Sequence, residues 1–192
     1  VAFEDLNINI SATELATKGV TFDLRTTTRQ GNLTGNVTVA GKVSGFNDAG
    51  EIDPDQASID GTADVTDLPV DGIDTLAGLN GLLTAAIGER LNLKVITKPG
   101  ESAQTVTATA DAAHLKVNLN ASVAEGKAGA NGSINFTATP AFVTKLAGES
   151  GIALAGDVPV TVAIESLSAP VGAFDPAAVA AKIKAQVGDG TI

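Results

Sequence analysis

Most of this chain alternates apolar and polar residues with a period of two. In "EDLNINIS" (residues 4–11), Leu, Ile and Ile alternate with Asn, and "HLKVNLNA" (residues 114–121) alternates aliphatic residues with Lys and Asn. Successive side chains of a β-strand point to opposite faces, so each such segment predicts a strand with one apolar and one polar face. Clean alternation is typical of antiparallel sheets, whereas buried parallel strands read as continuous apolar runs. We expect about ten strands joined by short turns.

The composition limits both the core and the partners. Of the 192 residues 44% are hydrophobic but only 3% are aromatic, so we expect a shallow aliphatic core built on a sheet. The formal net charge of −10 repels nucleic acid and anionic membrane surfaces. Without Cys, the chain forms no disulfide and no thiolate metal site. No apolar run approaches the roughly 20 residues that span a bilayer, and the first residues lack the pattern of a signal peptide.

A first departure from the period of two follows Pro69. Apolar residues recur there at three- and four-residue spacing up to Gly88, and Asp71 or Asp74 can serve as the N-cap. This pattern predicts an amphipathic helix over residues 71–88.

A second departure follows Pro170. Asp175 is placed to cap a helix with Pro176 at its first position, an order typical of helix N-termini. The apolar stripe consists of Val179, Ile183 and Val187. The segment predicts a second amphipathic helix over residues 175–188.

The two departures align with each other. The matching positions are Leu68 with Leu167, Pro69 with Pro170, Asp74 with Asp175 and Gly88 with Gly188, which are 99 to 101 residues apart. We interpret this as an internal repeat of roughly one hundred residues, in which each unit buries part of its apolar face against its neighbours. A first unit, clipped at its start, would cover residues 1–88, and a second unit would cover residues 89–192. Because the last residues resemble the start of another strand, we expect the parent chain to continue.

Three segments carry a resemblance to a known family. They are "GTADVTDLPVDGIDTLAGLNGLLTAAIGERLNLKV" (61–95), "TATPAFVTKL" (137–146) and "VPVTVAIESLSAPV" (158–171). This chain resembles the repeating units of very large AsmA/TamB-like proteins of bacterial envelopes, well over residues 57–192 and only in strand character before that. The resemblance implies a long curved antiparallel sheet with an apolar groove for lipid acyl chains, and a part in phospholipid transport or envelope assembly. The family's membrane anchor and C-terminal region have no counterpart in this stretch.

The expected fold is α+β and mainly β, a curved antiparallel sheet of about ten strands with two amphipathic helices packed on its apolar face, in a repeat-type architecture. Sheet and helix residues on that face are the candidates for contact with lipid. They are Leu93, Val95, Leu115, Val117, Leu119, Val160, Val162 and Ile164 on strands, with Leu76, Leu83, Ile87 and Ile183 on the two helices.

An acidic loop is the candidate cation site. The loop "NDAGEIDPDQASID" holds Asp48, Glu51, Asp53, Asp55 and Asp60, and calcium prefers such oxygen ligands. The loop lacks the order of an EF-hand and contains Pro54, so a solvated acidic turn is favoured over calcium and no firm cofactor is expected.

Catalytic residues are not expected. His114 is the single histidine, so an imidazole pair for zinc or a triad cannot be assembled around it without distant partners. Asp67, Asp71 and Asp74 are close in sequence, but their place before a helix favours capping over acid–base chemistry. We therefore do not expect an enzyme.

Two functions remain open from the sequence. The first is a non-enzymatic module of a large bacterial cell-envelope protein, periplasmic or extracellular, whose β-groove binds or transfers lipid. The alternative is a structural subunit of an extracellular fibre, surface layer or adhesin, assembled by pairing of open strand edges with neighbouring units.

Overall fold

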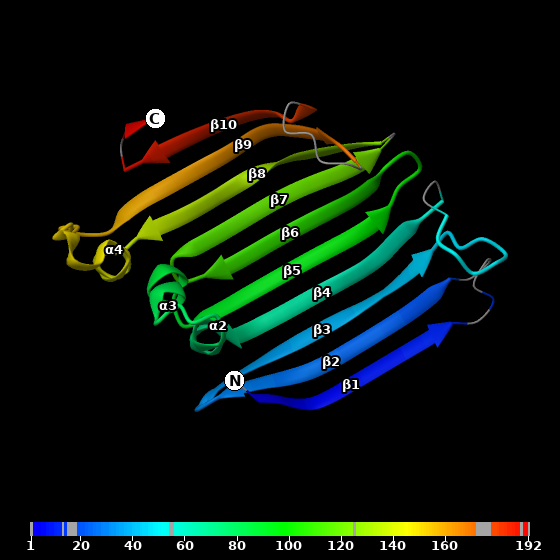
Figure 1. Cartoon of the computed structure of the whole chain (residues 1–192), viewed down its shortest axis with the longest axis horizontal. Helices are drawn as coiled ribbons and strands as arrows, with labels where there is room; N and C mark the ends of the chain where they lie inside the picture. Colours follow the sequence, from blue (N-terminus) through cyan, green and yellow to red (C-terminus); the bar gives the residue numbers. More distant parts are fainter. Residues whose placement is uncertain are drawn as a thin grey trace.

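The computed structural model describes residues 2–12, 14, 19–53, 56–124, 126–171, 178–188 and 190–191. It is mainly β, and its strands form one antiparallel sheet in which every strand pairs with the next one along the chain (Figure 1). The strands are β1 (Ala2–Ala12), β2 (Val20–Gln30), β3 (Leu33–Ser44), β4 (Ser58–Pro69), β5 (Arg90–Pro99), β6 (Gln104–Ala112), β7 (Leu115–Ala124), β8 (Lys127–Ala138), β9 (Val158–Pro170), β10 (Ala180–Val187) and the two-residue β11 (Gly190–Thr191). The expectation of an antiparallel sheet of about ten strands is confirmed.

Short helices occupy two of the connections. They are α2 (Val70–Leu76) and α3 (Leu82–Ile87) between β4 and β5, and α4 (Pro140–Ala147) with the 3-10 helix η1 (Gly148–Ser150) between β8 and β9. All of them lie at the same end of the sheet, whereas the long loop between β3 and β4 lies at the other end (Figure 1). We call α2, α3 and α4 the helical cap. None of the described helices has the length and hydrophobicity needed to span a membrane.

Hairpin turns account for the simple strand order. Gln30 pairs with Leu33, so two residues close the hairpin between β2 and β3, and Gly31 at φ 56° supplies the left-handed conformation of this tight turn. Ala112 pairs with Leu115 in the same way across the β6–β7 turn. Such short connections hold consecutive strands side by side.

The core lies only under the helical cap. Val70, Ile87 and Ala112 are the buried hydrophobic residues of the described chain, and Leu83, Ala86, Leu91 and Leu115 pack against them. These side chains come from α2, α3 and the ends of β5, β6 and β7. The cap thus covers one end of the sheet and leaves the rest without a second layer.

The predicted helix over residues 71–88 is wrong as a single helix. It is divided into α2 and α3 by residues in the left-handed conformation, namely Gly78 at φ 67°, Asn80 at φ 53° and Gly81 at φ 79°. Three such residues within four positions interrupt the α-helical backbone.

The predicted helix over residues 175–188 is also wrong where the structure describes it. Residues 180–187 form β10, which pairs with β9 along its whole length. The segment also alternates with a period of two, because Ala181, Ile183 and Ala185 are separated by Lys182 and Lys184. Pairing with β9 favours the strand over the helix, because it provides hydrogen-bond partners for backbone N–H and C=O groups of residues 180–187. Asp175 and Pro176 lie outside the described residues.

The two segments that suggested a repeat are therefore not equivalent, because one contains α2 and α3 and the other contains β10. The sheet also continues across residues 88 and 89 through the pairing of β4 with β5. The helical connections follow β4 and β8, where Pro69 and Pro140 are 71 residues apart.

The first prediction concerns Val70, which is 0% exposed. Val70→Ala should lower the free energy of unfolding by about 2 kcal/mol, because two buried methyl groups are lost and a cavity remains. Leu76→Ala on the same helix is the matched control: Leu76 is 77% exposed, and its truncation should change stability by less than about 0.5 kcal/mol. Urea unfolding followed by circular dichroism measures both. Equal effects of the two changes would contradict a core centred on Val70.

Candidate functional site

The candidate site is the face of the sheet on which the helical cap lies, here called the apolar face. Directly opposed residues of antiparallel neighbours point to the same face, so the strand register shows which side chains share it. One row across the sheet consists of Ile8, Leu24, Val39, Ala63, Val95, Ala108, Leu119, Gly132, Ile164 and Ile183. A parallel row consists of Val37, Val65, Leu93, Ala110, Val117, Ile134, Val162 and Ala185. Neither row contains a charged residue.

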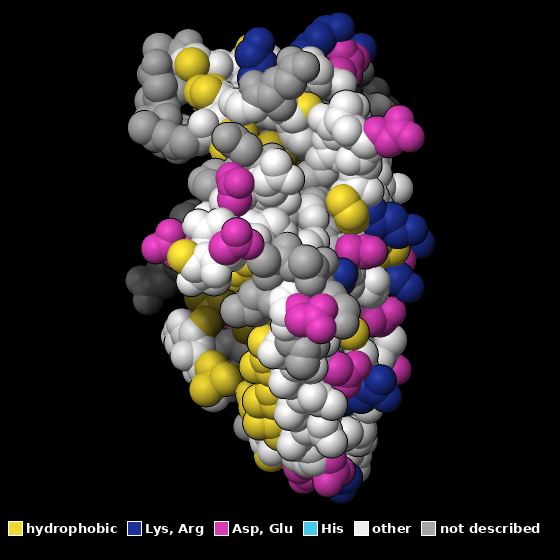
Figure 2. Space-filling view, turned by 90° about the vertical axis from the view of Figure 1, so that its right-hand side faces the viewer, with side chains coloured by type: hydrophobic (Ala, Val, Ile, Leu, Met, Phe, Trp, Pro, Cys, Tyr) yellow, Lys and Arg dark blue, Asp and Glu magenta, His cyan; other side chains and the backbone are white. Residues whose placement is uncertain are grey.

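The apolar face is continuous across ten strands. Nine strand spacings of about 4.8 Å make it roughly 43 Å wide. The largest apolar patch of an ordinary soluble monomer covers up to about 600 Å², which corresponds to a width of roughly 25 Å. Figure 2 shows hydrophobic side chains gathered on one side of the sheet and most charged side chains on the other. The apolar face is thus a largely uncovered surface, wider than the apolar patches of ordinary soluble monomers.

The exposed area of the whole chain supports this interpretation. The chain exposes 11779 Å², whereas a compact monomer of 19.1 kDa is expected to expose about 8,400 Å². The excess of about 3,400 Å² reflects a sheet that lacks a second layer over most of its area.

Glycine shapes the apolar face at two points. A Cβ at Gly41 would lie 2.9 Å from Cζ of Phe22, so this glycine leaves room for the aromatic ring. A Cβ at Gly132, which has φ +153°, would lie 2.1 Å from the carbonyl oxygen of Asn118. Around Phe22, Val39, Ala63 and Val95 the face has a hollow of about 120 Å³ with almost entirely apolar walls.

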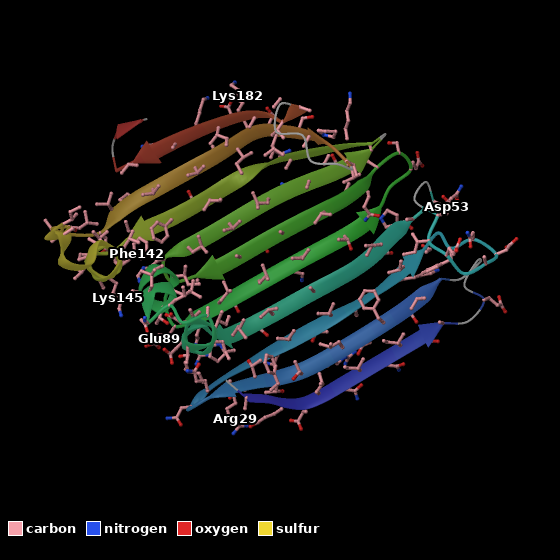
Figure 3. The ribbon with its side chains drawn as sticks, viewed as in Figure 1. Arg29, Asp53, Glu89, Phe142, Lys145 and Lys182 are labelled. Carbon is pink, nitrogen blue, oxygen red and sulfur yellow. The ribbon has the colours of Figure 1, made fainter. Side chains whose placement is uncertain are left out.

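The helical cap closes one end of the apolar face over β4 to β8. The ring of Phe142 on α4 stacks edge-on against Phe136 of β8, with the ring centroids 5.3 Å apart. Lys145 of α4 donates from Nζ to the carbonyl oxygen of Asn80 at 2.9 Å, which joins α4 to the turn between α2 and α3 (Figure 3). The N–H of His114 donates to the carbonyl oxygen of Ile87 at 3.3 Å. Two of these contacts fix the cap to the sheet, and the third holds α4 to the rest of the cap.

Asp74 holds α2 and α3 together. Its side chain is 0% exposed, and its two carboxylate oxygens accept from the N–H groups of Gly81 and Thr84, each at 3.0 Å. Burial raises the pKa of this carboxyl, but the hydrogen bonds from Thr84 and Gly81 lower it by more, so the pKa lies below its ordinary value of 3.8. The sequence predicts that Asp74 caps its own helix, whereas its side chain accepts from N–H groups at the start of α3.

The opposite face of the sheet, here called the polar face, carries ion pairs. They are Asp23 with Arg25, Glu4 with Arg29, Asp64 with Lys94, Asp111 with Lys116, and Glu165 with both Lys182 and Lys184. Between β6 and β9 this face has a hollow of about 610 Å³, lined by residues such as Thr107, Asn120, Asn131 and Glu165. Exposed pairs of this kind contribute less than about 1 kcal/mol each, so the polar face is a solvated surface.

Most of the predicted lipid-contacting residues lie on the apolar face. The register places the strand residues Leu93, Val95, Leu115, Val117, Leu119, Val160, Val162 and Ile164 there. Leu83 and Ile87 belong to the packed core of the cap, whereas Leu76 is 77% exposed. Ile183 lies on this face as a residue of β10, not of a helix.

The residues predicted to contact lipid do not include the half of the apolar face that lies on β1 to β4. Phe22, Leu24, Val39 and Val65 extend it without a break toward β1. The alternation of these residues with polar ones could have identified them, but the strand residues predicted to contact lipid were taken only from the later strands.

The acidic loop between β3 and β4 has its own internal contacts. Oδ1 of Asn47 accepts from the N–H groups of Ala49 at 3.0 Å and Glu51 at 2.9 Å. Among the described residues, no group of three or more His, Asp or Glu side chains could hold a metal ion, and Asp55 lies outside them. The preference for a solvated acidic turn over calcium at this loop stays untested.

The three neighbouring aspartates have different partners. Asp67 is in the left-handed conformation at φ 53° within a β-bulge and lies 3.5 Å from Arg90. Asp71 accepts from the side chain of Gln30. No side chain caps the N-terminus of α2, so the expectation that Asp71 or Asp74 caps this helix is wrong.

The fold and the face define a class: an open, single-layer antiparallel sheet with a capped apolar face. Comparison of the chain with protein-family models, curated proteins and solved structures finds no match.

The second prediction concerns Asp74 and pH. A carboxyl with a lowered pKa in the folded state stabilises the fold above its unfolded-state pKa, and this contribution is lost as pH falls through the folded-state pKa. Asp74→Asn should therefore be less stable than the unmodified chain at pH 7, and the difference should shrink below pH 3.8. Urea unfolding at several pH values measures the difference.

Asp71→Asn is the matched control, because Asp71 is exposed and makes one side-chain hydrogen bond to Gln30. Its change in stability should stay within about 0.5 kcal/mol. A pH-independent difference for Asp74→Asn would contradict the role of its charge.

Proposed function

We propose that the protein is a non-enzymatic module of the bacterial cell envelope, periplasmic or extracellular, whose apolar face binds lipid acyl chains. The observation that carries the proposal is the unbroken apolar row from Ile8 on β1 to Ile183 on β10. The AsmA/TamB-like resemblance of residues 57–192 suggests the same function. Transfer of the bound lipid, or its delivery during envelope assembly, is part of this proposal.

The chemistry of the face fits an acyl chain better than a polar ligand. Aliphatic side chains and glycine make up the row through Val95 and Leu119, so this row offers no side-chain hydrogen-bond donor to a headgroup. The nearby ion pairs, such as Asp64 with Lys94, lie on the polar face. A bound lipid would keep its headgroup in water and place its tail on the face.

The energetics favour reversible binding. An acyl chain of about 16 carbons gains ~0.8 kcal/mol for each fully buried methylene, and an open face removes water from roughly half of its surface. The gross gain of about 6 kcal/mol per chain is reduced by the cost of ordering the chain. Weak attachment of this kind suits a surface that holds lipid and then passes it on.

The helical cap makes the two ends of the apolar face different. Phe136, Leu115 and Leu91 lie beneath or beside the cap at one end of the strands, whereas the described residues between the strands at the opposite end form no helix (Figure 1). An acyl chain along the strands would therefore enter from the loop end and stop at the cap.

The third prediction compares two neighbouring residues of β5. Val95 lies on the apolar face, because it pairs with Ala63 and Ala108, whereas Ile96 pairs with Thr62 and Thr107 on the polar face. Val95→Glu should weaken binding of a fluorescent fatty acid at least about tenfold, equivalent to 1.4 kcal/mol, since the tail would have to desolvate a carboxylate. Ile96→Glu should change it less than about twofold. Fluorescence titration measures both, with circular dichroism as the check on folding.

Native mass spectrometry of the purified protein provides an independent readout. Acyl lipid should accompany the unmodified chain and be reduced in Val95→Glu. Absence of lipid binding by the unmodified chain, or equal losses in both variants, would contradict the proposal and leave the structural-subunit alternative.

A further inference from the structure

The hollow on the polar face between β6 and β9 has the dimensions of a ligand site. Its volume is about 610 Å³, and small-molecule sites usually measure about 300–1,000 Å³. Two rows of residues that cross the strands line it. The first row consists of Thr107, Asn120, Asn131 and Glu165 with Ser166, and the second consists of Thr105, Ser122 and Gly129. Three strand spacings of about 4.8 Å make the hollow roughly 14 Å long.

A β-bulge in β9 places Glu165 at this hollow. Opposite the single residue Asn131 of β8, β9 has two residues, Glu165 and Ser166. The register between β9 and β10 shifts at the same residue. Ile164 and Leu167 on either side keep to the apolar face, so Glu165 and Ser166 both line the hollow. Bulges are frequent beside functional sites, where the extra residue redirects a side chain.

The side chains of the hollow match a ligand that carries hydroxyl groups. Hydroxyl and amide side chains both donate and accept hydrogen bonds, as the hydroxyl groups of a sugar do. Among the described residues, no hydrogen bond within the chain uses the side chain of Ser122, Asn131 or Ser166. Asn120 only accepts one bond, from the hydroxyl of Thr107 at 3.3 Å. The remaining donors and acceptors are therefore available to a ligand.

Glu165 is the one charged residue among the described residues that line the hollow. Its two carboxylate oxygens accept from Lys182 and Lys184. These hydrogen bonds lower the pKa of Glu165 to about 2, so the group is ionised at neutral pH. A carboxylate has about four acceptor positions, and about two remain for adjacent hydroxyl groups of a ligand.

The charges around the hollow favour a neutral ligand. Lys182 and Lys184 offset the charge of Glu165, which disfavours a bound cation. An anion in the hollow would lie directly beside the carboxylate, because the lysines themselves are not among the residues that line it.

We propose that this hollow binds a neutral saccharide, which lies across β6 to β9 and exchanges hydrogen bonds with Asn120, Ser122, Asn131 and the carboxylate of Glu165. No aromatic residue is among the described residues that line the open hollow, so a short saccharide should bind weakly, with a Kd on the order of 1 mM. The site lies on the face opposite to the apolar face, and the proposal does not require lipid there.

The fourth prediction fills the hollow from Gly129. A Cβ at Gly129 would lie 3.7 Å from Oγ of Ser122 and 3.7 Å from the carbonyl oxygen of Leu167, which is ordinary van der Waals contact, so Gly129→Leu should fold. Its side chain would occupy the hollow and should weaken saccharide binding at least about fivefold. Ser133→Leu is the matched control, because Ser133 lies on the same face of β8 but outside the described lining. Its binding should change less than about twofold.

Titration followed by NMR measures the binding, with cellotriose, maltotriose and triacetylchitotriose as neutral probes. At least one probe should shift backbone amide signals of residues that line the hollow. Circular dichroism checks the folding of each variant.

A second pair of variants tests the site without filling it. Asn120 and Asn118 are both exposed on the polar face of β7, but only Asn120 lines the hollow. Asn120→Ala should weaken binding at least about threefold through the loss of a hydrogen bond, whereas Asn118→Ala should leave it unchanged.

Three results would overturn the proposal. The first is the absence of shifts with all three probes, and the second is equal binding by Asn120→Ala and Asn118→Ala. The third is a shift of the same signals by inorganic phosphate at similar concentrations, because Lys182 and Lys184 would then form an anion site.

Discussion

The structure depends on one constraint: a sheet buries its apolar side chains only where a second layer covers them. In this chain the second layer is the helical cap, and the buried hydrophobic residues of the described chain, Val70, Ile87 and Ala112, all lie at it. Across the rest of the apolar face the backbone is satisfied by strand pairing while the side chains stay half exposed. Much of the hydrophobic surface of the sheet therefore remains exposed.

Most of the strands and apolar-face residues that were predicted correctly follow from the alternation of apolar and polar residues with a period of two. Residues such as Leu93 and Val95 lie on the predicted face because alternation fixes which residues share a side once a strand forms. Ile183 was assigned to a helix because Val179, Ile183 and Val187 recur at helical spacing, although residues 180–187 also alternate with a period of two. Only pairing with β9 distinguishes a strand from a helix in this segment. The local sequence of residues 180–187 does not show that pairing.

The helical cap was predicted in part. The segment after Pro69 is helical, but its division depends on the left-handed residues Gly78, Asn80 and Gly81. Helix α4 was missed although its signals are local: Thr139 caps it by accepting from the N–H of Phe142 at 3.1 Å, and Pro140 occupies its first turn. The contact of Asp74 with Thr84 joins residues ten positions apart, and no spacing rule for helix caps reaches that far.

The open face has its origin in the simple strand order. Each strand of the meander pairs with the next one along the chain, and the bulges at Asp67 and Glu165 bend strands without moving apolar side chains to the polar face. Among the described residues, the helical connections after β4 and β8 supply the second layer, so the depth of the apolar face is set by the helical cap.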